Sequence, residues 1–547
     1  MTLHPQFISD IPEETYRVAK AIFPQGNLYM QMRDVLGTIY EDEQFANLYP
    51  SVGQLAEVPW RLALVTVMQF AENLTDRQAA EAVRVRIDWK YALGLELTDT
   101  GFHFSVLSGF RARLVSSQSS EQLLNTILER CNSLELLKSR SKQRTDSTHI
   151  LASIRMLNRL EQVGEMLRYT LNELAHVVPL WLKSWVDKEW FMRYGDRFEN
   201  QRLPSEKPER EVLAQTIGAD GYVLLQAIYD ESAPCALHKL EAVQLLQRMW
   251  IQQFYLEDDE VRWRTKDDLP PSDKMLTSPY DPDARYSHKR LTTWIGYKVH
   301  LTESCEADLP CLITHVETTS ATTQDVEVVD DVHADLAQQD LLPGDHFVDM
   351  GYMSSDVLVT SQQQGVDLVG PVRADTSWQA QTEGAYDIRQ FQIDWEQQTV
   401  RCPMGKINGY WREGTGKFGK PNVNVGFKPS DCRPCAAATR CTRNKKNKAR
   451  TLTFPQKAEY QALQVARERQ TTDDFKERYR TRSGVEGLIS QAAFTLGMRR
   501  TRYRGIDKTH LQNLATASAI NVLRAINWLM DKPKAKTRIS HFAALAA

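Results

Sequence analysis

The chain has 547 residues, of which 42% are apolar and 25% are charged, the composition of an ordinary globular protein. Its 67 basic and 70 acidic residues leave a net charge of −3, so any attraction to nucleic acid must come from a local segment. The first residues lack the basic and apolar regions of a signal peptide, and the uncharged stretch 511–523 is shorter than the ~20 residues that span a bilayer. We therefore expect neither a secreted nor a membrane-spanning protein.

The N-terminal part of the chain is predicted to be helical. Thr75 and Gln78 form a capping box in front of one helix, and a later amphipathic helix carries Arg111 and Arg113 off its apolar face. Two short helices with exposed arginines fit a helix-turn-helix that contacts DNA. They equally fit plain helix packing, so both interpretations stay open.

The middle of the chain alternates between strand and helix patterns. Residues 143–150 are rich in Thr, Ser and Ile, and apolar residues alternate with period two from Ile295 to Leu301, as in half-buried strands. This alternation indicates a mixed sheet with helices packed on it, and hence a multidomain α/β fold. The predicted organisation is a helical N-terminal domain (1–135), a first core strand (136–150), a helical insertion (151–275), core strands and helices (276–380), a β-rich insertion (381–456), and C-terminal core helices with a basic tail (457–547).

Three acidic residues stand out by their context. Asp146 lies within a predicted strand, Asp349 closes another strand, and Glu486 lies on a helix expected to begin near Arg482. A single carboxylate is most often a solvated surface group. Carboxylates from two strands and a helix can nevertheless converge on hard cations, which prefer oxygen ligands, and two such ions support phosphoryl transfer.

A basic segment surrounds the third of these carboxylates. Between residues 476 and 508 there are nine basic residues and three acidic ones, so this segment has a net charge of +6. Tyr479, Arg482 and Glu486 are spaced three and four apart, which predicts that they share one helical face. The segment is a suitable anchor for phosphates, although a salt-bridged surface helix is the alternative.

These blocks resemble the catalytic blocks of bacterial insertion-sequence transposases of the DDE type, in the branch with a β-rich insertion between the second Asp and the Glu. Residues 479–486 resemble the block around the third acidic residue, and residues 296–302, 348–352 and 502–505 also match these proteins in style. The helical N-terminal block resembles the domain often fused to them. Seven residues after the glutamate, where the family often has Lys or Arg, this chain has Ala493. Either a nearby arginine such as Arg499 substitutes for it or this phosphate contact is absent.

The resemblance implies a ribonuclease-H-like core that binds two Mg²⁺ (or Mn²⁺) ions and works as a homodimer on double-stranded DNA in the bacterial cytoplasm, at the nucleoid. It implies that Asp146, Asp349 and Glu486 are the metal ligands. Arg482 would neutralise phosphate charge and Tyr479 would position the DNA strand. The expected DNA-binding residues are Arg499, Arg500, Arg502, Tyr503, Arg504 and Lys508.

Four of the eight cysteines lie inside the β-rich insertion, within a single stretch of forty residues. A set of four thiolates can bind one zinc ion tetrahedrally. A small insertion with little hydrophobic core would be stabilised by such a structural metal ion. Unliganded thiols in a small β subdomain are the alternative. The candidate zinc ligands are Cys402, Cys432, Cys435 and Cys441.

The leading hypothesis is a transposase that cleaves the ends of its insertion sequence and joins the freed 3′ ends to target DNA. Its DNA substrates would be the terminal inverted repeats of the element and the target DNA. A stand-alone metal-dependent nuclease on the same fold is one rival, and a domesticated DNA-binding derivative is another. A tyrosine or serine recombinase would be separated from these by a covalent protein–DNA adduct. The sequence does not indicate the terminal repeats, the target preference or a hairpin intermediate.

Overall fold

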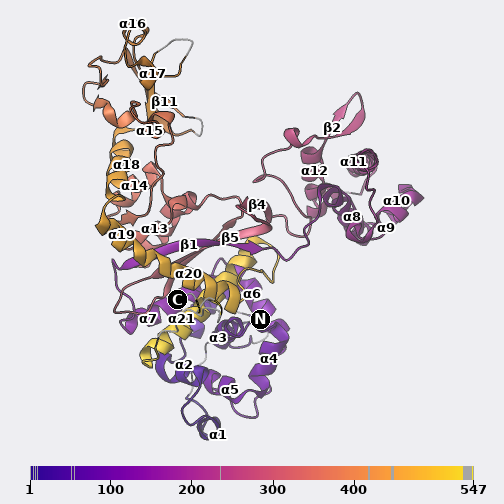
Figure 1. The fold of residues 1–547 in the computed structure, drawn as a ribbon. Helices are drawn as coiled ribbons and strands as arrows, with labels where there is room; N and C mark the ends of the chain where they lie inside the picture. Colours follow the sequence, from indigo (N-terminus) through magenta and orange to yellow (C-terminus); the bar gives the residue numbers. More distant parts are fainter. Residues whose placement is uncertain are drawn as a thin grey trace. The chain divides into compact units, whose positions relative to one another are not determined.

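The computed structural model describes the chain except for residues 1, 4, 6, 7, 9, 51, 54, 55, 235, 417, 418, 445–448, 534–541, 543, 544, 546 and 547. Most of the predicted basic tail lies outside the described residues. The chain forms two compact units (Figure 1): unit 1 comprises residues 1–138, 146–323 and 486–547, and unit 2 comprises residues 139–145 and 324–485. Within the described residues, no helix combines the length and the apolar character needed to cross a membrane.

The N-terminal part of unit 1 is helical because its apolar residues follow helical spacing. The most apolar helix, α3, begins at Pro59, a residue whose fixed φ suits the first helical position, and nearly all of its side chains are buried. The capping box of Thr75 and Gln78 is present at the start of α4. The helices are α1 (Glu13–Ile22), α2 (Leu28–Leu36), α3 (Pro59–Ala71), α4 (Asp76–Val85), α5 (Ile87–Leu93), α6 (Ser105–Ser116) and α7 (Gln122–Ser133).

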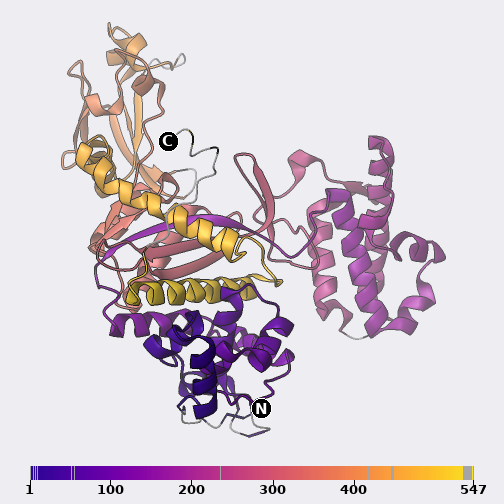
Figure 2. The same cartoon turned by 60° about the horizontal axis from the view of Figure 1, so that its bottom comes forward.

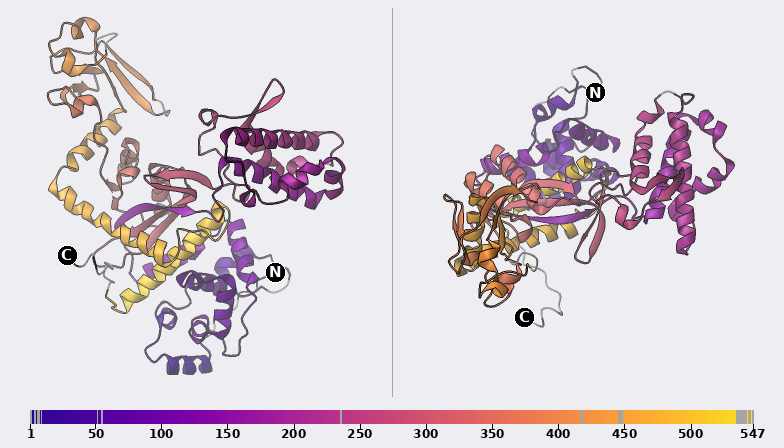
Figure 3. Two further views of the ribbon diagram at one scale, coloured as in Figure 1. Left: turned by 45° about the vertical axis from the view of Figure 1, so that its right-hand side comes forward. Right: turned by 90° about the horizontal axis from the view of Figure 1, so that it is seen from above.

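A second group of helices follows the first long strand and has its own apolar core (Figure 3). Asn158 caps the first of them in a capping box with Glu161, and Gly221 lets Trp250 approach the helix backbone, since a Cβ there would overlap the indole ring. The elements are α8 (Arg159–Val177), α9 (Pro179–Trp185), α10 (Lys188–Tyr194), α11 (Lys207–Tyr229), α12 (Glu241–Gln253) and the hairpin of β2 (Phe254–Glu257) and β3 (Glu260–Trp263).

The central sheet is six-stranded, with the order β4-β5-β1-β7-β8 and β6 paired with β5. β1 pairs with β7, and β7 with β8, in parallel, whereas β5 pairs antiparallel with β4 through its first residues and with β6 through its later ones. The α/β multidomain fold expected from the sequence is therefore confirmed. The strands are β1 (Lys142–Leu151), β4 (Arg285–Lys289), β5 (Thr292–Ser304), β6 (Ile313–Ser320), β7 (Asp345–Phe347) and β8 (Asp367–Val369).

In unit 2, α13 precedes β7 and α14 lies between β7 and β8, and a β-rich insertion follows. The insertion is built on a three-stranded antiparallel sheet and a short strand pair, around a small core of Val and Phe side chains. These elements are α13 (Val329–Gln338), α14 (Ser355–Gln363), α15 (Trp378–Gln381), β9 (Gln392–Asp394), β10 (Thr399–Arg401), β11 (Tyr410–Thr415), β12 (Pro421–Gly426), α16 (Pro429–Cys432), α17 (Ala438–Cys441) and β13 (Thr451–Phe454).

The helix that the sequence predicts to begin near Arg482 is part of a longer helical run, which starts at Asp473. The chain forms α18 (Lys457–Arg469), α19 (Asp473–Tyr479), the 3-10 helix η8 (Arg480–Gly484), α20 (Val485–Ser490), the π-helical turn η9 (Gln491–Thr495) and α21 (Ile506–Leu529). Tyr479, Arg482 and Glu486 thus lie in three successive helical elements, α19, η8 and α20, which follow one another without an intervening loop. In unit 1, α21 packs against α3, α7 and β6 (Figure 2).

Candidate active site

The carboxylate of Asp349 is fixed by the turn that follows β7. Asp349 is the N-cap of the short 3-10 helix η6 (Met350–Tyr352), and its Oδ1 accepts the backbone N–H of Gly351 at 2.7 Å. A capping carboxylate satisfies an N–H that the first helical turn leaves unpaired. Asp349 is half-buried, so the turn holds it at the surface of unit 2 with one oxygen already oriented.

Asp325 provides a second carboxylate at the same place in unit 2. A Cβ built on Gly351 would lie 2.9 Å from Oδ1 of Asp349 and 3.0 Å from Oδ2 of Asp325. Two carboxylate oxygens therefore face one residue that has no side chain, and their combined charge favours a cation. The sequence analysis missed Asp325, and its one signal was the polar start of the short helix η5 (Asp325–Val328), where Gln324 and Glu327 form a capping box.

Asp146 lies in the middle of β1, half-buried, and its Oδ1 accepts the backbone N–H of Ser147 at 2.8 Å. Two residues earlier, Arg144 donates from its guanidinium to the carbonyl of Thr481 at 2.6 Å. A Cβ on Gly484 would overlap this guanidinium, so only glycine allows the close approach. The chain just before Asp146 and the chain just before Glu486 are therefore in contact within unit 2.

Glu486 is exposed in the first turn of α20, while its neighbours Val485 and Leu488 are buried and anchor the helix. In unit 2, Tyr479 stacks on Phe475 with ring centroids 5.5 Å apart and an interplanar angle of 9°. Arg482 is half-buried in η8. Asp146 and Glu486 belong to unit 1, whereas Asp349 belongs to unit 2.

Part of the basic segment is engaged in ion pairs, as the salt-bridged alternative expects. In unit 2, Arg478 contacts Asp345 at 3.2 Å and Asp367 at 3.0 Å, and Arg469 contacts Asp367 at 2.6 Å. Burial opposes the charge of Arg478, but the hydrogen bonds and charges of Asp367 and Asp345 together outweigh it and raise the pKa of its guanidinium. These arginines tie α18 and α19 to the strands β7 and β8.

Residues 499–508 of unit 1 divide into exposed cations and residues that contact protein. Arg500, Arg504 and Lys508 are exposed, although the guanidinium of Arg504 also lies 5.1 Å from the ring centroid of Tyr280. Arg502 donates to the carbonyl of Leu74 at 2.5 Å and to the Asn73 side chain. The guanidinium of Arg502 also lies 4.7 Å from the ring centroid of Phe70, and burial lowers its pKa.

Two further residues of this segment have protein partners in unit 1. The guanidinium of Arg111 lies 5.4 Å from the ring centroid of Tyr503, and burial raises the pKa of the Tyr503 hydroxyl. The guanidinium of Arg499 lies 5.0 Å from the exposed ring of Phe494, and its Nε donates to Thr148 of β1 at 3.1 Å. Thr148 is two residues after Asp146 on the same strand, so both side chains lie on the same face.

Arg111 itself is buried and forms an ion pair with Asp76 at 2.5 Å, which corrects the expectation that it is exposed. Arg113 lies 5.0 Å from the ring centroid of Tyr49. The helix pair therefore uses Arg111 for packing.

The four cysteines of the β-rich insertion line one cavity of about 30 Å³ in unit 2. The backbone N–H of Lys406 donates to Sγ of Cys402 at 3.3 Å, and burial raises the pKa of the Cys441 thiol to about 11. The sulfurs are less tightly gathered than a bound zinc would hold them, since among the described residues no three of these cysteines have sulfurs within 4.8 Å of one another. The cavity is large enough for an ion or one water.

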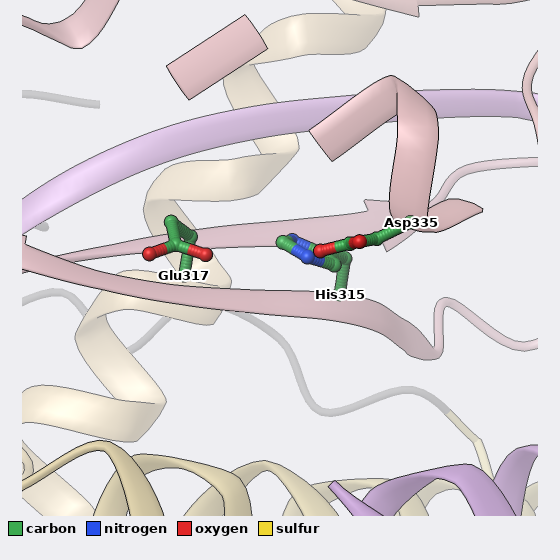
Figure 4. A group of neighbouring side chains, drawn as sticks. All are labelled: His315, Glu317 and Asp335. Atoms are coloured by element: carbon green, nitrogen blue, oxygen red, sulfur yellow. The ribbon is translucent and has the colours of Figure 1, made fainter. Parts of the chain in front are cut away.

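β6 presents one further pair of polar side chains. His315 and Glu317 are two residues apart and therefore stand on the same face of the strand, as Figure 4 shows. Asp335, also drawn in Figure 4, lies on α13 and belongs to the other compact unit. We assign no metal site to this pair.

Two protein families match parts of the chain. Residues 17–113, from α1 into α6, match the Transposase domain (DUF772), and residues 401–526 match the Transposase DDE domain. The second match includes Glu486 and the four cysteines, whereas Asp146 and Asp349 lie outside both matches. No curated protein and no solved structure matches the chain.

Proposed function

We propose that the chain is a transposase of the DDE type, which cleaves the ends of its insertion sequence and joins the 3′ ends to target DNA by two-metal-ion phosphoryl transfer. Transposase DDE domains belong to enzymes that cleave DNA and transfer its strands. The observation that carries the proposal is the match of residues 401–526, which include Glu486, to this domain.

In this proposal Asp146, Asp349 and Glu486 hold two Mg²⁺ or Mn²⁺ ions on a ribonuclease-H-like core. The pair of carboxylates around Gly351 supports it, since oxygen ligands with concentrated negative charge suit a hard cation. When bound, the ions supply charge stabilisation at the scissile phosphate and an activated attacking oxygen. The capping bond from Gly351 keeps one oxygen of Asp349 in place, which leaves its other oxygen for a ligand role.

The remaining residues bind and orient the DNA. We propose that Arg482 neutralises phosphate charge and that Tyr479 positions the strand by hydrogen bonding or stacking. Arg500, Arg504 and Lys508, which are exposed, contact phosphates, and Arg499 with Phe494 offers a cationic and an aromatic surface near β1. Arg502 and Tyr503 act indirectly, because their protein contacts hold this segment against the N-terminal helices.

Two further assignments complete the proposal. The four cysteines bind one structural zinc, supported by their shared cavity and by the N–H of Lys406 that donates to the Cys402 sulfur. Four thiolates close the coordination shell, so the ion takes no part in catalysis. The enzyme acts as a homodimer on two terminal inverted repeats, since two ends must be joined to one target.

A strand-transfer assay tests the proposed function. Purified protein is incubated with Mg²⁺, a labelled duplex carrying the repeats found beside its gene, and a supercoiled target plasmid. We expect labelled ends covalently joined to plasmid DNA, because a DNA 3′ hydroxyl is the second nucleophile. Cleaved ends without joined products would favour the stand-alone nuclease, and binding without cleavage would favour the domesticated derivative.

A further inference from the structure

The β-rich insertion carries a second concentration of positive charge in a chain that is otherwise acidic overall. Residues 401–450 contain thirteen basic residues and two acidic ones, a net charge of +11 in a chain whose overall charge is −3. This segment lies outside the basic segment of residues 476–508. Like charges at this density repel one another, so the fold of the insertion gains from a partner that neutralises them.

Among the described residues, nearly all of these cations are exposed, and most of the exposed ones show no carboxylate partner. Among the described residues of the segment, eight basic side chains are exposed, and two of them form ion pairs: Lys406 with Asp431 at 4.0 Å and Lys420 with Asp356 at 2.6 Å. For the other six exposed cations, the described part of the chain shows no ion pair. They are Arg401, Arg412, Lys428, Arg433, Arg440 and Arg443.

Three of these arginines lie over aromatic rings, which limits their freedom before any partner binds. The guanidinium of Arg443 is 4.2 Å from the ring centroid of Trp378, that of Arg440 is 5.2 Å from Tyr386, and that of Arg412 is 5.0 Å from Tyr410. A guanidinium stacked in this way keeps its edge N–H groups outward, and less side-chain entropy is lost when they bind an anion.

Two of the stacked arginines are placed by the cysteine-bearing part of the insertion. Arg440 lies in α17, its carbonyl accepts the N–H of Tyr386 at 3.0 Å, and the carbonyl of Cys441 accepts from Gln379 at 3.2 Å. The half-buried guanidinium of Arg450 also donates to the Cys441 carbonyl at 3.2 Å. The backbone of α17 is thus fixed from two sides. Arg440 within α17 and Arg443, two residues after its end, are both exposed.

We infer that the described part of the β-rich insertion carries a second DNA-binding surface, which holds the phosphate backbone of double-stranded DNA through Arg433, Arg440 and Arg443. Several unpaired guanidiniums on one small subdomain match a regular polyanion better than a folded acidic protein, whose carboxylates are irregularly spaced. The inference rests on the proposed function, and it adds a DNA contact that is separate from the one proposed for residues 499–508. Its binding is independent of sequence, because phosphate contacts carry no base information.

The test compares the salt dependence of DNA binding by the full-length protein and its variants. A fluorescent duplex of arbitrary sequence serves as the probe, and dissociation constants are measured over a series of KCl concentrations. In a plot of log affinity against log salt concentration, each phosphate contact steepens the slope by about 0.9. We expect the double variant Arg440→Gln/Arg443→Gln to lower the slope by about 1.8, and Arg440→Lys/Arg443→Lys to keep it.

A matched control is the double variant Arg197→Gln/Lys207→Gln in the helical insertion, which removes two exposed cations that pair with Glu199 and Glu211. We expect its slope to equal that of the wild type. An unchanged slope in the folded Arg440→Gln/Arg443→Gln protein would overturn the inference while leaving the proposed function intact. An equal loss in the control would also overturn it, whereas a wild type that binds no DNA would contradict the proposed function itself.

Discussion

At the scale of single residues, Gly351 explains how Asp349 is held ready for a ligand. The backbone N–H of this glycine fixes one oxygen of Asp349, and its missing side chain leaves room for the carboxylates of Asp349 and Asp325. The sequence alone does not show that a glycine next to an acidic residue is needed. The structure shows that the site requires a residue without a side chain at position 351.

Gly351→Ala is therefore expected to reduce DNA cleavage by about tenfold or more, because small displacements of reacting groups carry large rate penalties. The added Cβ would lie 2.9 Å from Oδ1 of Asp349, and the carboxylate must shift. Gly487→Ala is the matched control, since a Cβ there meets nothing within 4 Å although it adjoins Glu486. Cleavage rates for the two variants check this prediction, and equal rates would contradict it.

The arginines after η9 differ in what they do, and a pair of variants separates them. Arg502→Gln removes bonds to Leu74 and Asn73, so we expect the free energy of unfolding to fall by about 1–3 kcal/mol. Arg500 is exposed, and Arg500→Gln is expected to leave stability unchanged but to lower the salt slope of DNA binding by about 0.9. Urea denaturation and binding titrations measure both. A reversed pattern would assign the phosphate contact to Arg502.

At the scale of elements, a buried hydrogen-bond chain joins three parts of unit 2. Oγ1 of Thr145 on β1 bonds to Nε2 of His346 on β7 at 2.6 Å, and Nδ1 of His346 bonds to Nε2 of His333 on α13 at 2.8 Å. These strands lead directly to Asp146 and Asp349. The chain therefore holds α13 and the two strands in register next to the candidate ligands.

Acid is expected to destabilise this connection. Burial lowers the pKa of His333 from 6.5 to about 4, against a smaller opposing effect of Asp330. The unfolded chain takes up a proton near pH 6.5 and the folded chain does not, so stability is complete above that pH and falls as the pH drops. The loss should reach about 3 kcal/mol near pH 4. Denaturation curves of the wild type and His333→Leu measure it, and an equal pH dependence of both would exclude His333 as the cause.

The β-rich insertion is the element whose stability depends most on its proposed metal. Its core is small, and the Cys441 thiol has a raised pKa, so it stays protonated at neutral pH unless a metal binds it. Removing zinc with a chelator is expected to increase amide exchange in residues 400–450 while DDE cleavage in Mg²⁺ is affected less. Metal analysis of the purified protein is the direct check. Absence of zinc together with four freely reactive thiols would rule the site out.

At the scale of the whole molecule, the order of helical and strand regions was predictable because hydrophobic periodicity reports local burial. The α/β fold, the capping box at Thr75 and the long strand around Asp146 followed from such patterns. The change to a 3-10 helix at Arg480–Gly484, just before Glu486, did not, since no proline marks it. Arg144, which is distant in sequence, packs against Gly484 in this segment, and that contact is not visible in a local pattern.

The candidate site was predictable only in part, for the same reason. The sequence indicated Asp349 as a residue that closes a strand, but Asp325 became visible only when Gly351 brought the two carboxylates together. Arg111 and Arg502 were expected to be exposed cations, and each has a protein partner through tertiary packing. Local patterns identify residue types that can bind DNA, whereas packing decides which of them are available.

The central claim is that Asp146, Asp349 and Glu486 hold the catalytic metal ions while other residues hold the DNA. The most direct test measures Mg²⁺-dependent cleavage and DNA affinity for Asp146→Asn, Asp349→Asn and Glu486→Gln. We predict that each variant loses cleavage by more than about 100-fold, the upper limit for residues that only support a metal ligand, with affinity unchanged. Near-wild-type cleavage by any one of the three would contradict the assignment.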